Sequence, residues 1–223
     1  MKKIAVITAG GIGNRMGIDT PKQFLLLAGK PLLWHCIQSF LTAFNDIDFI
    51  LILPAHYLDG AEALIADLQI GHRTTIVAGG STRFHSVQNG LKKIEEPAVI
   101  FVHDGVRCLV SPNLIKRCYE QTMQTGSAIP AVVSTDSIRL DQGGYSQSID
   151  RNLVHIVQTP QTFLSELLLP AFEQDYCDSF TDEATVVEAA GKKVALIEGE
   201  YRNIKITRPV DLLMAEMLLA EKG

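Results

Sequence analysis

A glycine-rich loop with two basic residues is the first part of the sequence whose residue types and spacing could do chemistry. Residues 8–17 read TAGGIGNRMG and follow a short apolar run. Glycine lacks a Cβ atom, so such a loop lets backbone N–H groups approach the oxygens of a phosphate. Arg15 lies inside the loop and Lys22 follows it. Two cations beside a phosphate suit transfer at phosphorus, where negative charge builds up on oxygen. Two solvated surface cations are the plainer alternative.

The sequence excludes two familiar phosphate loops at this position. Met16 stands where the dinucleotide fingerprint G-x-G-x-x-G needs its third glycine. No Gly-Lys-Ser or Gly-Lys-Thr triplet follows that would make a P-loop. The kind of phosphate chemistry must therefore be argued from further motifs.

A second glycine motif reads AGGSTR at residues 78–83 and also follows an apolar run. The adjacent Gly79 and Gly80 would allow close contact with a flat base. Ser81 or Thr82 could instead do no more than cap the helix that follows.

A third motif, HDGVR at residues 103–107, places Asp104 at the end of a predicted strand. A carboxylate in that place could lie near a metal ion bound to a triphosphate. A buried ion pair between Asp104 and Arg107 is the competing interpretation.

Three motifs in the second half of the chain are weaker by themselves. TPQTF at residues 159–163 and TDE at 181–183 are also compatible with simple turn and helix-cap chemistry. NIKIT at 203–207 predicts a short strand with Lys205 at its centre. A lysine among apolar residues needs an anionic partner or a path to water, although protection of an edge strand would also explain it.

Alternating strands and helices would position these motifs. Apolar runs at residues 3–8, 49–53, 74–78 and 98–102 predict strands, and helical spacing follows at 32–44, 58–68 and 84–94. Continuous apolar strands indicate burial on both faces, as in a parallel sheet between helices. We expect an α/β, Rossmann-like, doubly wound and mainly parallel sheet. Ligands of such sheets bind beyond the carboxyl ends of the strands, where the first three motifs lie. Later elements are predicted as a helix at 181–190, a strand at 193–197 and a closing helix from Pro209.

Residues 134–158 interrupt this alternation and predict a protruding β-arm. Two polar segments flank a Gln-Gly-Gly turn, as in a hairpin. A two-stranded hairpin is marginal alone in water, so a second copy of the chain is the expected support. We therefore expect one domain over residues 1–223 with a dimerisation arm at about 134–158.

Composition limits the class of protein. The chain has 223 residues, 47% of them hydrophobic and 20% charged, as in ordinary globular proteins. Neither a membrane span nor a signal peptide is expected, which favours the cytoplasm. A net charge of −5 argues against general binding of nucleic acid. The four cysteines lack a CxxC pair, so we expect reduced thiols rather than a zinc site or a disulfide framework.

Taken together and in this order, the motifs resemble those of the 2-C-methyl-D-erythritol 4-phosphate cytidylyltransferase family of non-mevalonate isoprenoid biosynthesis. The resemblance covers residues 3–220 and is carried by TAGGIGNRMG, PKQF, AGGSTR with SVQNGL, HDGVR, the Asp150-Arg-Asn arm, TPQTF, TDEA and NIKIT. It implies transfer of CMP from CTP to 2-C-methyl-D-erythritol 4-phosphate, with release of pyrophosphate and with Mg²⁺ or another divalent cation as cofactor.

The resemblance also implies roles for individual residues. Those around the triphosphate would be Arg15, Lys22 and Lys205. Those holding the cytidine would be Ala9, Gly10, Gly11, Gly79, Gly80 and Ser86. Those around the acceptor would be Asp104, Arg107, Thr159 and Thr181, together with Ser137 and Arg151 from the arm of a partner subunit in a homodimer. Asp104 would in addition lie near the metal, in direct or indirect contact.

Three alternatives remain open at this point. A ribitol-5-phosphate or other polyol-phosphate cytidylyltransferase would differ only in the acceptor pocket. A nucleotidyltransferase for UTP or GTP would need a different base pocket around Ser81 and Ser86. A non-catalytic nucleotide-binding regulatory module could keep the fold without the chemistry, although retention of Arg15, Lys22, Asp104 and Lys205 argues against it.

Overall fold

The computed structural model describes residues 1–10, 22–54 and 57–221. Within them, eight strands form one sheet in the order β10-β7-β11-β6-β1-β4-β5, and β12 also pairs with β7. The strands β1 (Lys2–Thr8), β4 (Ile47–Leu53), β5 (Thr74–Ala78) and β6 (Ala98–Asp104) are mutually parallel. The nearly continuous burial of β1, β4 and β6 confirms the predicted two-sided core, whereas β5, at the edge of the sheet, is only partly buried.

The other half of the sheet is mixed. β11 (Gln161–Leu164) runs antiparallel to both β6 and β7 (Ser127–Val133). β10 (His155–Val157) is antiparallel to β7, whereas β12 (Leu196–Glu198) is parallel to it. The strand predicted at 193–197 is β12, which begins three residues later than predicted, at Leu196.

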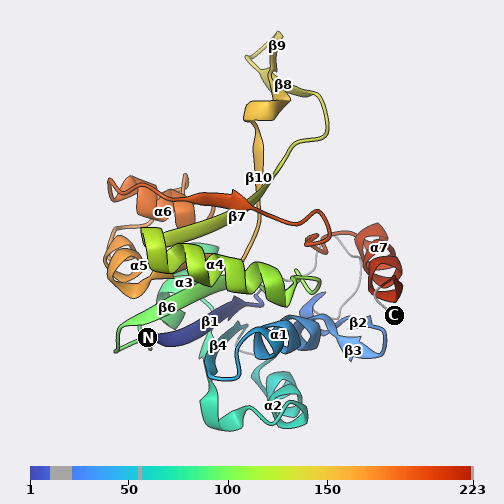
Figure 1. Cartoon of the computed structure of the whole chain (residues 1–223), viewed down its shortest axis with the longest axis vertical. Helices are drawn as coiled ribbons and strands as arrows, with labels where there is room; N and C mark the ends of the chain where they lie inside the picture. The colour runs from blue at the N-terminus through green and yellow to red at the C-terminus, as the bar shows by residue number, and fades with distance from the viewer. Residues whose placement is uncertain (11–21, 55–56, 222–223) are drawn as a thin grey trace.

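Helices cover both faces of the sheet, as a doubly wound fold requires. On one face lie α1 (Leu32–Ala43) and α4 (Pro112–Thr125), with α2 (Leu58–Asp67) beside them. Leu33, Ile37 and Phe40 recur at helical spacing, which gives α1 its buried stripe. On the other face lie α3 (Arg83–Leu91), α5 (Ser165–Ala171) and α6 (Glu183–Ala189) (Figure 1). The closing helix α7 (Pro209–Ala220) begins at the predicted proline.

Small elements also occur in the described first half of the chain, and one local prediction was wrong. A 3₁₀ turn, η1 (Lys22–Phe24), and a short hairpin of β2 (Leu26–Leu27) and β3 (Lys30–Pro31) precede α1; another 3₁₀ turn, η3 (Gly71–Arg73), precedes β5. Residues 203–207 do not form the predicted strand. Ile206 N–H donates to Val106 O, and the carbonyl oxygens of Asn203 and Thr207 accept from side chains of Arg107 and Lys22. Side-chain donors therefore replace a regular strand ladder.

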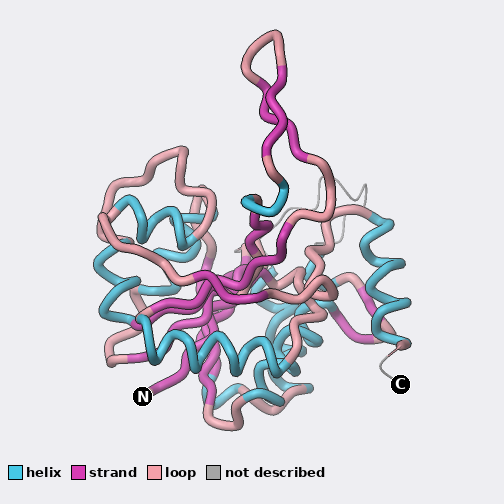
Figure 2. Tube along the Cα trace, turned by 45° about the horizontal axis from the view of Figure 1, so that its top comes forward, coloured by secondary structure: helices cyan, strands magenta, loops and turns pink. Residues whose placement is uncertain are grey.

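The predicted arm is present, but it is shorter than residues 134–158. Its hairpin comprises β8 (Ile138–Asp141) and β9 (Ser146–Ile149), and a 3₁₀ turn η4 (Arg151–Leu153) follows. The segment then re-enters the main sheet as β10. Figures 1 and 2 show the hairpin standing well away from the body of the molecule.

The remaining expectations concern thiols and membrane spans. All four cysteines are free, with Cys36, Cys108 and Cys118 buried and Cys177 exposed, which agrees with reduced thiols. In the described part of the chain, no helix has the length and apolar character needed to cross a bilayer. Whether residues 1–223 behave as one domain stays a prediction.

Candidate functional site

The parallel register brings the sequence motifs together at one edge of the sheet. Thr8 at the end of β1 is aligned with Ile52 of β4 on one side and with Asp104 of β6 on the other. Leu53 of β4 is in turn aligned with Ala78 of β5. The three loops that follow β1, β5 and β6 therefore start side by side, as the strand-end argument predicted.

A cavity of about 660 Å³ lies at this edge. Its described lining comes from the ends of β1 and β4, from η1, from the loop before α3, from the end of β6 and from residues 205–207. Among the residues predicted to bind substrates, it includes Ala9, Gly10, Lys22, Gly80, Ser86, Asp104 and Lys205. Six sequence motifs were considered, and four of them share this one space.

The second glycine motif is held tightly around a single hydroxyl group. Ser86 Oγ accepts a hydrogen bond of 3.0 Å from Gly80 N–H and donates one of 2.8 Å to Thr82 O. Gly79 N–H donates to Leu53 O, which ties the loop to β4. A Cβ atom on Gly80 would lie 2.5 Å from His85 Cβ, so a side chain there is excluded unless the loop or α3 moves. The capping interpretation is also correct in part, since Thr82 accepts from His85 N–H at the start of α3.

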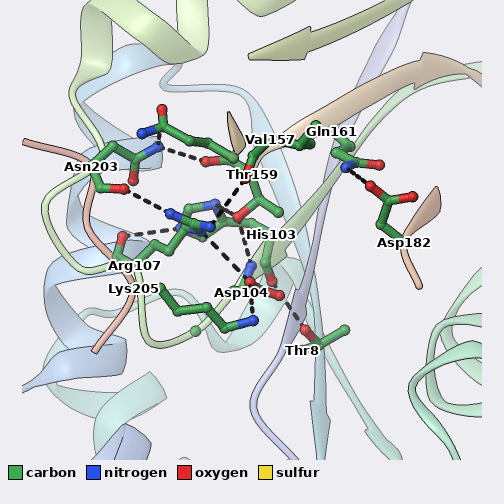
Figure 3. A network of polar contacts seen from close by, with 12 residues as sticks. Thr8, His103, Asp104, Arg107, Val157, Thr159, Gln161, Asp182, Asn203 and Lys205 are labelled. Atoms are coloured by element: carbon green, nitrogen blue, oxygen red, sulfur yellow. Dashed lines mark hydrogen bonds and ion pairs between the residues drawn. The ribbon is translucent and has the colours of Figure 1, made fainter. Parts of the chain in front are cut away.

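Asp104 is the centre of a cluster of charges (Figure 3). Its Oδ2 atom lies 2.9 Å from Lys205 Nζ and 3.6 Å from Arg107 Nε, and its Oδ1 atom lies 3.4 Å from Arg83 Nη2. Arg83 in turn contacts the buried carboxylate of Glu183 at 2.5 Å. Three cations and two carboxylates leave the cluster with one net positive charge. The predicted Asp104–Arg107 ion pair is therefore real, but it is one contact of a larger network.

The charges fix the ionisation state of Asp104. Burial would raise the pKa of this carboxyl, but the positive charges of Arg83, Lys205 and Arg107 outweigh burial and hold its pKa well below the usual range. For Arg107, burial lowers the pKa, and the charge of Asp104 opposes that shift. His103, which is fully buried, has its pKa lowered to about 4 by burial and is neutral at pH 7.

One long-range contact joins the early and late parts of the chain at the site, and a local contact supports it. Lys22 Nζ donates to Thr207 O at 2.7 Å. Thr207 N–H and its hydroxyl donate to Asp211 in the first turn of α7. The lysine after the glycine loop is thus placed against residues 205–207, which also carry Lys205.

Thr159 and Arg107 are not among the described residues that line the cavity. Thr159 Oγ1 accepts a hydrogen bond of 3.1 Å from Asp104 N–H and lies 3.0 Å from His103 Nδ1. Arg107 Nη1 donates to Asn203 O at 2.8 Å (Figure 3). Both side chains hold the loop of Asp104, and their predicted contact with an acceptor stays a prediction.

The other predicted acceptor residues lie apart from the cavity in a single chain. Thr181 is exposed and precedes α6, whose cap is Asp182 and not Thr181. Ser137 and Arg151 are exposed on the arm, where Arg151 Nη1 donates to Thr135 O. Gly11 and Arg15 lie outside the described residues, so their predicted roles stay predictions.

Sequence reasoning did not assign a role to Arg83, Glu183 or Gln23. Arg83 and Gln23 line the cavity, and Glu183 reaches it through Arg83. The position of Arg83, directly after two glycines and at the start of a helix, was a usable signal. The partner of Arg83 could not be identified from the sequence, because Glu183 lies a hundred residues further along the chain.

A pocket at the carboxyl edge of a doubly wound sheet, lined by glycine loops and lysines, defines a nucleotide-binding α/β protein of the nucleotidyltransferase class. Comparison with known proteins gives the family. The sequence profile of 2-C-methyl-D-erythritol 4-phosphate cytidylyltransferase matches residues 3–221, and the chain belongs to this family.

Individual relatives agree with this assignment. The chain is 42% identical over 219 residues to the 2-C-methyl-D-erythritol 4-phosphate cytidylyltransferase of Phocaeicola vulgatus, covering 98% of this chain and 100% of that protein. It is 43% identical over 221 residues to the enzyme of that name from Porphyromonas gingivalis, covering 98% of each.

Solved structures share the fold over the whole chain. The 4-diphosphocytidyl-2C-methyl-D-erythritol synthase of Anaerococcus prevotii has a TM-score of 0.84 at 27% identity, over 98% of this chain and 96% of that one. The 2-C-methyl-D-erythritol 4-phosphate cytidylyltransferase of Thermus thermophilus has a TM-score of 0.75 at 31% identity, over 99% and 100%. The predicted fold class and family resemblance are therefore confirmed.

Proposed function

We propose that this chain transfers CMP from CTP to 2-C-methyl-D-erythritol 4-phosphate, giving 4-diphosphocytidyl-2-C-methyl-D-erythritol and pyrophosphate. The observation that carries the proposal is the shared cavity, whose described lining brings together the loop of Gly80 and Ser86, the cations Lys22 and Lys205, and Asp104. A nucleoside triphosphate needs contacts for its base and cations for its phosphates, both of which this lining offers, and family membership supplies the name of the acceptor.

The reaction needs no covalent intermediate with the protein. A phosphate oxygen of the acceptor attacks the α-phosphorus of CTP, a new P–O bond forms, and the bond from the α-phosphorus to the bridging oxygen of the β-phosphate breaks. Pyrophosphate leaves with that electron pair. Two anionic reactants must approach each other, so Lys22 and Lys205, with Arg15, would reduce the repulsion and stabilise the charge that develops in the transition state.

The described lining of the cavity suits a divalent cation that is carried mainly by the nucleotide. Asp104 is the one carboxylate in that lining, and no group of three acidic, His or Cys side chains is gathered among the described residues. Mg²⁺ is commonly bound by one or two carboxylates together with substrate phosphates, which fits this donor set. Bound Mg²⁺ would neutralise phosphate charge, and Asp104 would hold it directly or through water.

The arm supplies the remaining part of the proposal, a homodimer with shared sites. Ser137 and Arg151 are exposed on the arm and are not among the described residues that line the cavity of their own chain. The arm and the sheet edge at its base also expose large apolar side chains, namely Val133, Leu140, Leu153 and Ile156. Exposed apolar groups on a protruding element favour burial against another surface, and a second copy is the simplest one. The sequence of the arm was described as polar, but the folded arm also exposes these apolar side chains.

Release of pyrophosphate measures the proposed function directly. The purified chain would be assayed with CTP, UTP, ATP and GTP against 2-C-methyl-D-erythritol 4-phosphate, ribitol 5-phosphate and no acceptor, with Mg²⁺ present and with it removed by EDTA. We expect the highest kcat/KM for CTP with the methylerythritol phosphate and no turnover in EDTA. Equal kcat/KM for CTP and UTP would contradict the base-pocket assignment, and a preference for ribitol 5-phosphate would establish the other acceptor. Binding of CTP without turnover of any acceptor would identify a regulatory module.

Where the reaction takes place was also predicted from the sequence. Nucleotide and polyol phosphate are charged, water-soluble substrates, which suits the expected cytoplasmic location. The net charge of −5 likewise suits small anionic ligands bound by a local cluster of cations, without general affinity for nucleic acid.

A further inference from the structure

The contact between Arg83 and Glu183 joins two elements that are far apart in the sequence. Arg83 is the first residue of α3 and Glu183 is the first residue of α6. The guanidinium and the carboxylate meet through two bonds, Nη1 to Oε1 at 2.5 Å and Nη2 to Oε2 at 3.0 Å. This two-bond geometry fixes the plane of the guanidinium as well as its distance.

The carboxylate of Glu183 is unusually buried for a charged residue in the first turn of a helix, because its side chain is only 1% exposed. A buried carboxylate is costly to desolvate, and an apolar pair of similar volume would often be at least as stable. The start of α6 is also rigidly fixed. Gln161 of β11 donates from Nε2 to Asp182 and accepts from Ala184 N–H, both at 2.8 Å (Figure 3). Because the buried Glu183 adds little stability of its own, we explain its presence by the side chain that it holds, Arg83.

The guanidinium of Arg83 also contacts the reaction pocket, through Asp104. Arg83 Nη2 lies 3.4 Å from Asp104 Oδ1, while the other oxygen of Asp104 faces Lys205. Arg83 is partly exposed and lines the cavity, whereas Glu183 is absent from its described lining. The order of contacts is therefore Gln161 and the start of α6, then Glu183, Arg83 and Asp104.

We propose that Glu183 is a positioning residue that acts through Arg83 to set the orientation of the Asp104 carboxylate. Glu183 balances the charge of Arg83 and holds its fork against α6, so that only one nitrogen reaches Asp104. Without the negative charge of Glu183, the guanidinium turns towards Asp104 and forms a two-bond ion pair with it. Asp104 is then withdrawn from the acceptor side of the pocket. This inference rests on the proposed function for its kinetic test and on geometry alone for its structural test.

Glu183→Gln is the first variant, because it keeps the shape of the side chain and removes the charge. We expect kcat to fall at least about tenfold, while the Kd of CTP measured by calorimetry changes less than about threefold. Glu200→Gln is the matched control, since Glu200 also pairs with an arginine, Arg117 at 3.6 Å, but lies outside the pocket. That variant should keep the kcat of the wild type. A fall in kcat for both variants alike, or none for Glu183→Gln, would overturn the proposal.

A double-mutant cycle separates positioning from ordinary stabilisation. If Glu183 acts through Asp104, Glu183→Gln should lower kcat less than about threefold further in an Asp104→Asn background. Losses that multiply would mean that Glu183 acts elsewhere, and the proposal would be wrong. Should Glu183→Gln fail to fold, Arg83→Lys replaces it in the same cycle, because lysine keeps the charge beside Glu183 but loses the fork.

A crystal structure of the nucleotide-free Glu183→Gln chain tests the inference without turnover. We expect Arg83 to have left α6 and to contact both oxygens of Asp104. An Arg83 side chain that still lies against residue 183, with Asp104 unchanged, would overturn the proposal. Lack of CMP transfer by the wild-type chain would instead contradict the proposed function and leave this structural result to decide the role of Glu183.

Discussion

Lys205 and Asp104 form the ion pair at the centre of the site, with Nζ and Oδ2 2.9 Å apart. The chain provides a nearly matched pair on its surface, because Lys30 Nζ also lies 2.9 Å from a carboxylate oxygen, that of Asp67. The two lysines are equally exposed, whereas Asp104 is buried and Asp67 is not. The same distance therefore occurs in two very different environments.

Removal of Lys205 should lower catalysis strongly, whereas removal of Lys30 should not affect it. We expect Lys205→Met to lower kcat at least about a hundredfold, because the lysine would stabilise charge that develops in the transition state. Lys30→Met should leave kcat unchanged and cost at most about 1 kcal/mol of stability, as is usual for exposed ion pairs. Steady-state kinetics and thermal unfolding of both variants give the comparison. Similar kinetic constants for the two variants would contradict the proposed catalytic role of Lys205.

Lys22 and Arg15 should contribute more to the transition state than to ground-state binding of CTP. Lys22→Ala and Arg15→Ala are each expected to lower kcat at least about a hundredfold, with a smaller change in the Kd of CTP. Single-turnover rates at saturating CTP measure the first quantity and calorimetry the second. Near-normal kcat in either variant would show that its residue has no catalytic role.

The loop at Gly80 should not tolerate a methyl group. In Gly80→Ala the new Cβ atom would lie 2.5 Å from His85 Cβ and 2.9 Å from the carbonyl carbon of His85, so the loop or α3 must shift. Overpacking of this kind costs about 1 to 3 kcal/mol, and we expect at least a tenfold increase in the KM for CTP. Gly71→Ala is the control, because its nearest neighbour would be 3.7 Å away. An unchanged KM in Gly80→Ala would mean that the loop does not hold the base.

The shared site can be tested by complementation between two inactive chains. Arg151→Ala and Lys22→Ala would be mixed under conditions in which subunits exchange. In a mixed dimer, one site takes Lys22 from one chain and Arg151 from the other, so it is intact. Random exchange makes about half of the dimers mixed, and about a quarter of all sites should recover.

Each variant mixed with itself is the control for that experiment, and a mass-labelled chain demonstrates exchange. Activity clearly above both controls supports a site shared between subunits. Proven exchange without recovery would place Arg151 either in the pocket of its own chain or outside catalysis.

The four thiols should differ sharply in reactivity. Burial raises the pKa of Cys108 and Cys118 to about 12 and also raises that of Cys36. The hydrogen bond from Ser179 lowers the pKa of the exposed Cys177. Since the thiolate is the reactive form, one thiol should be alkylated in the folded chain at pH 8 and all four in denaturant. Cys177→Ser should abolish the native reaction, and fast labelling of a second thiol would contradict the described burial.

The sequence by itself determined the sheet and the edge at which the motifs meet. The strands β1, β4 and β6 each contain a continuous apolar run, and a sheet covered on both faces buries such runs. Parallel strands share one carboxyl edge, so Thr8, Ala78 and Asp104 had to end near one another once the strands were recognised. Local patterns carried this information because each strand is a short, contiguous stretch.

The tertiary structure alone decided which charges meet. Arg83 pairs with Glu183 across a hundred residues, and Lys22 donates to Thr207 across 185. In the sequence, Glu183 belonged to a possible helix cap and Thr207 to a predicted strand, because a long-range pairing leaves no local periodic pattern. Residues 203–207 resembled a strand for the same reason: their apolar alternation is local, whereas the side-chain donors that replace the strand ladder come from distant parts of the chain.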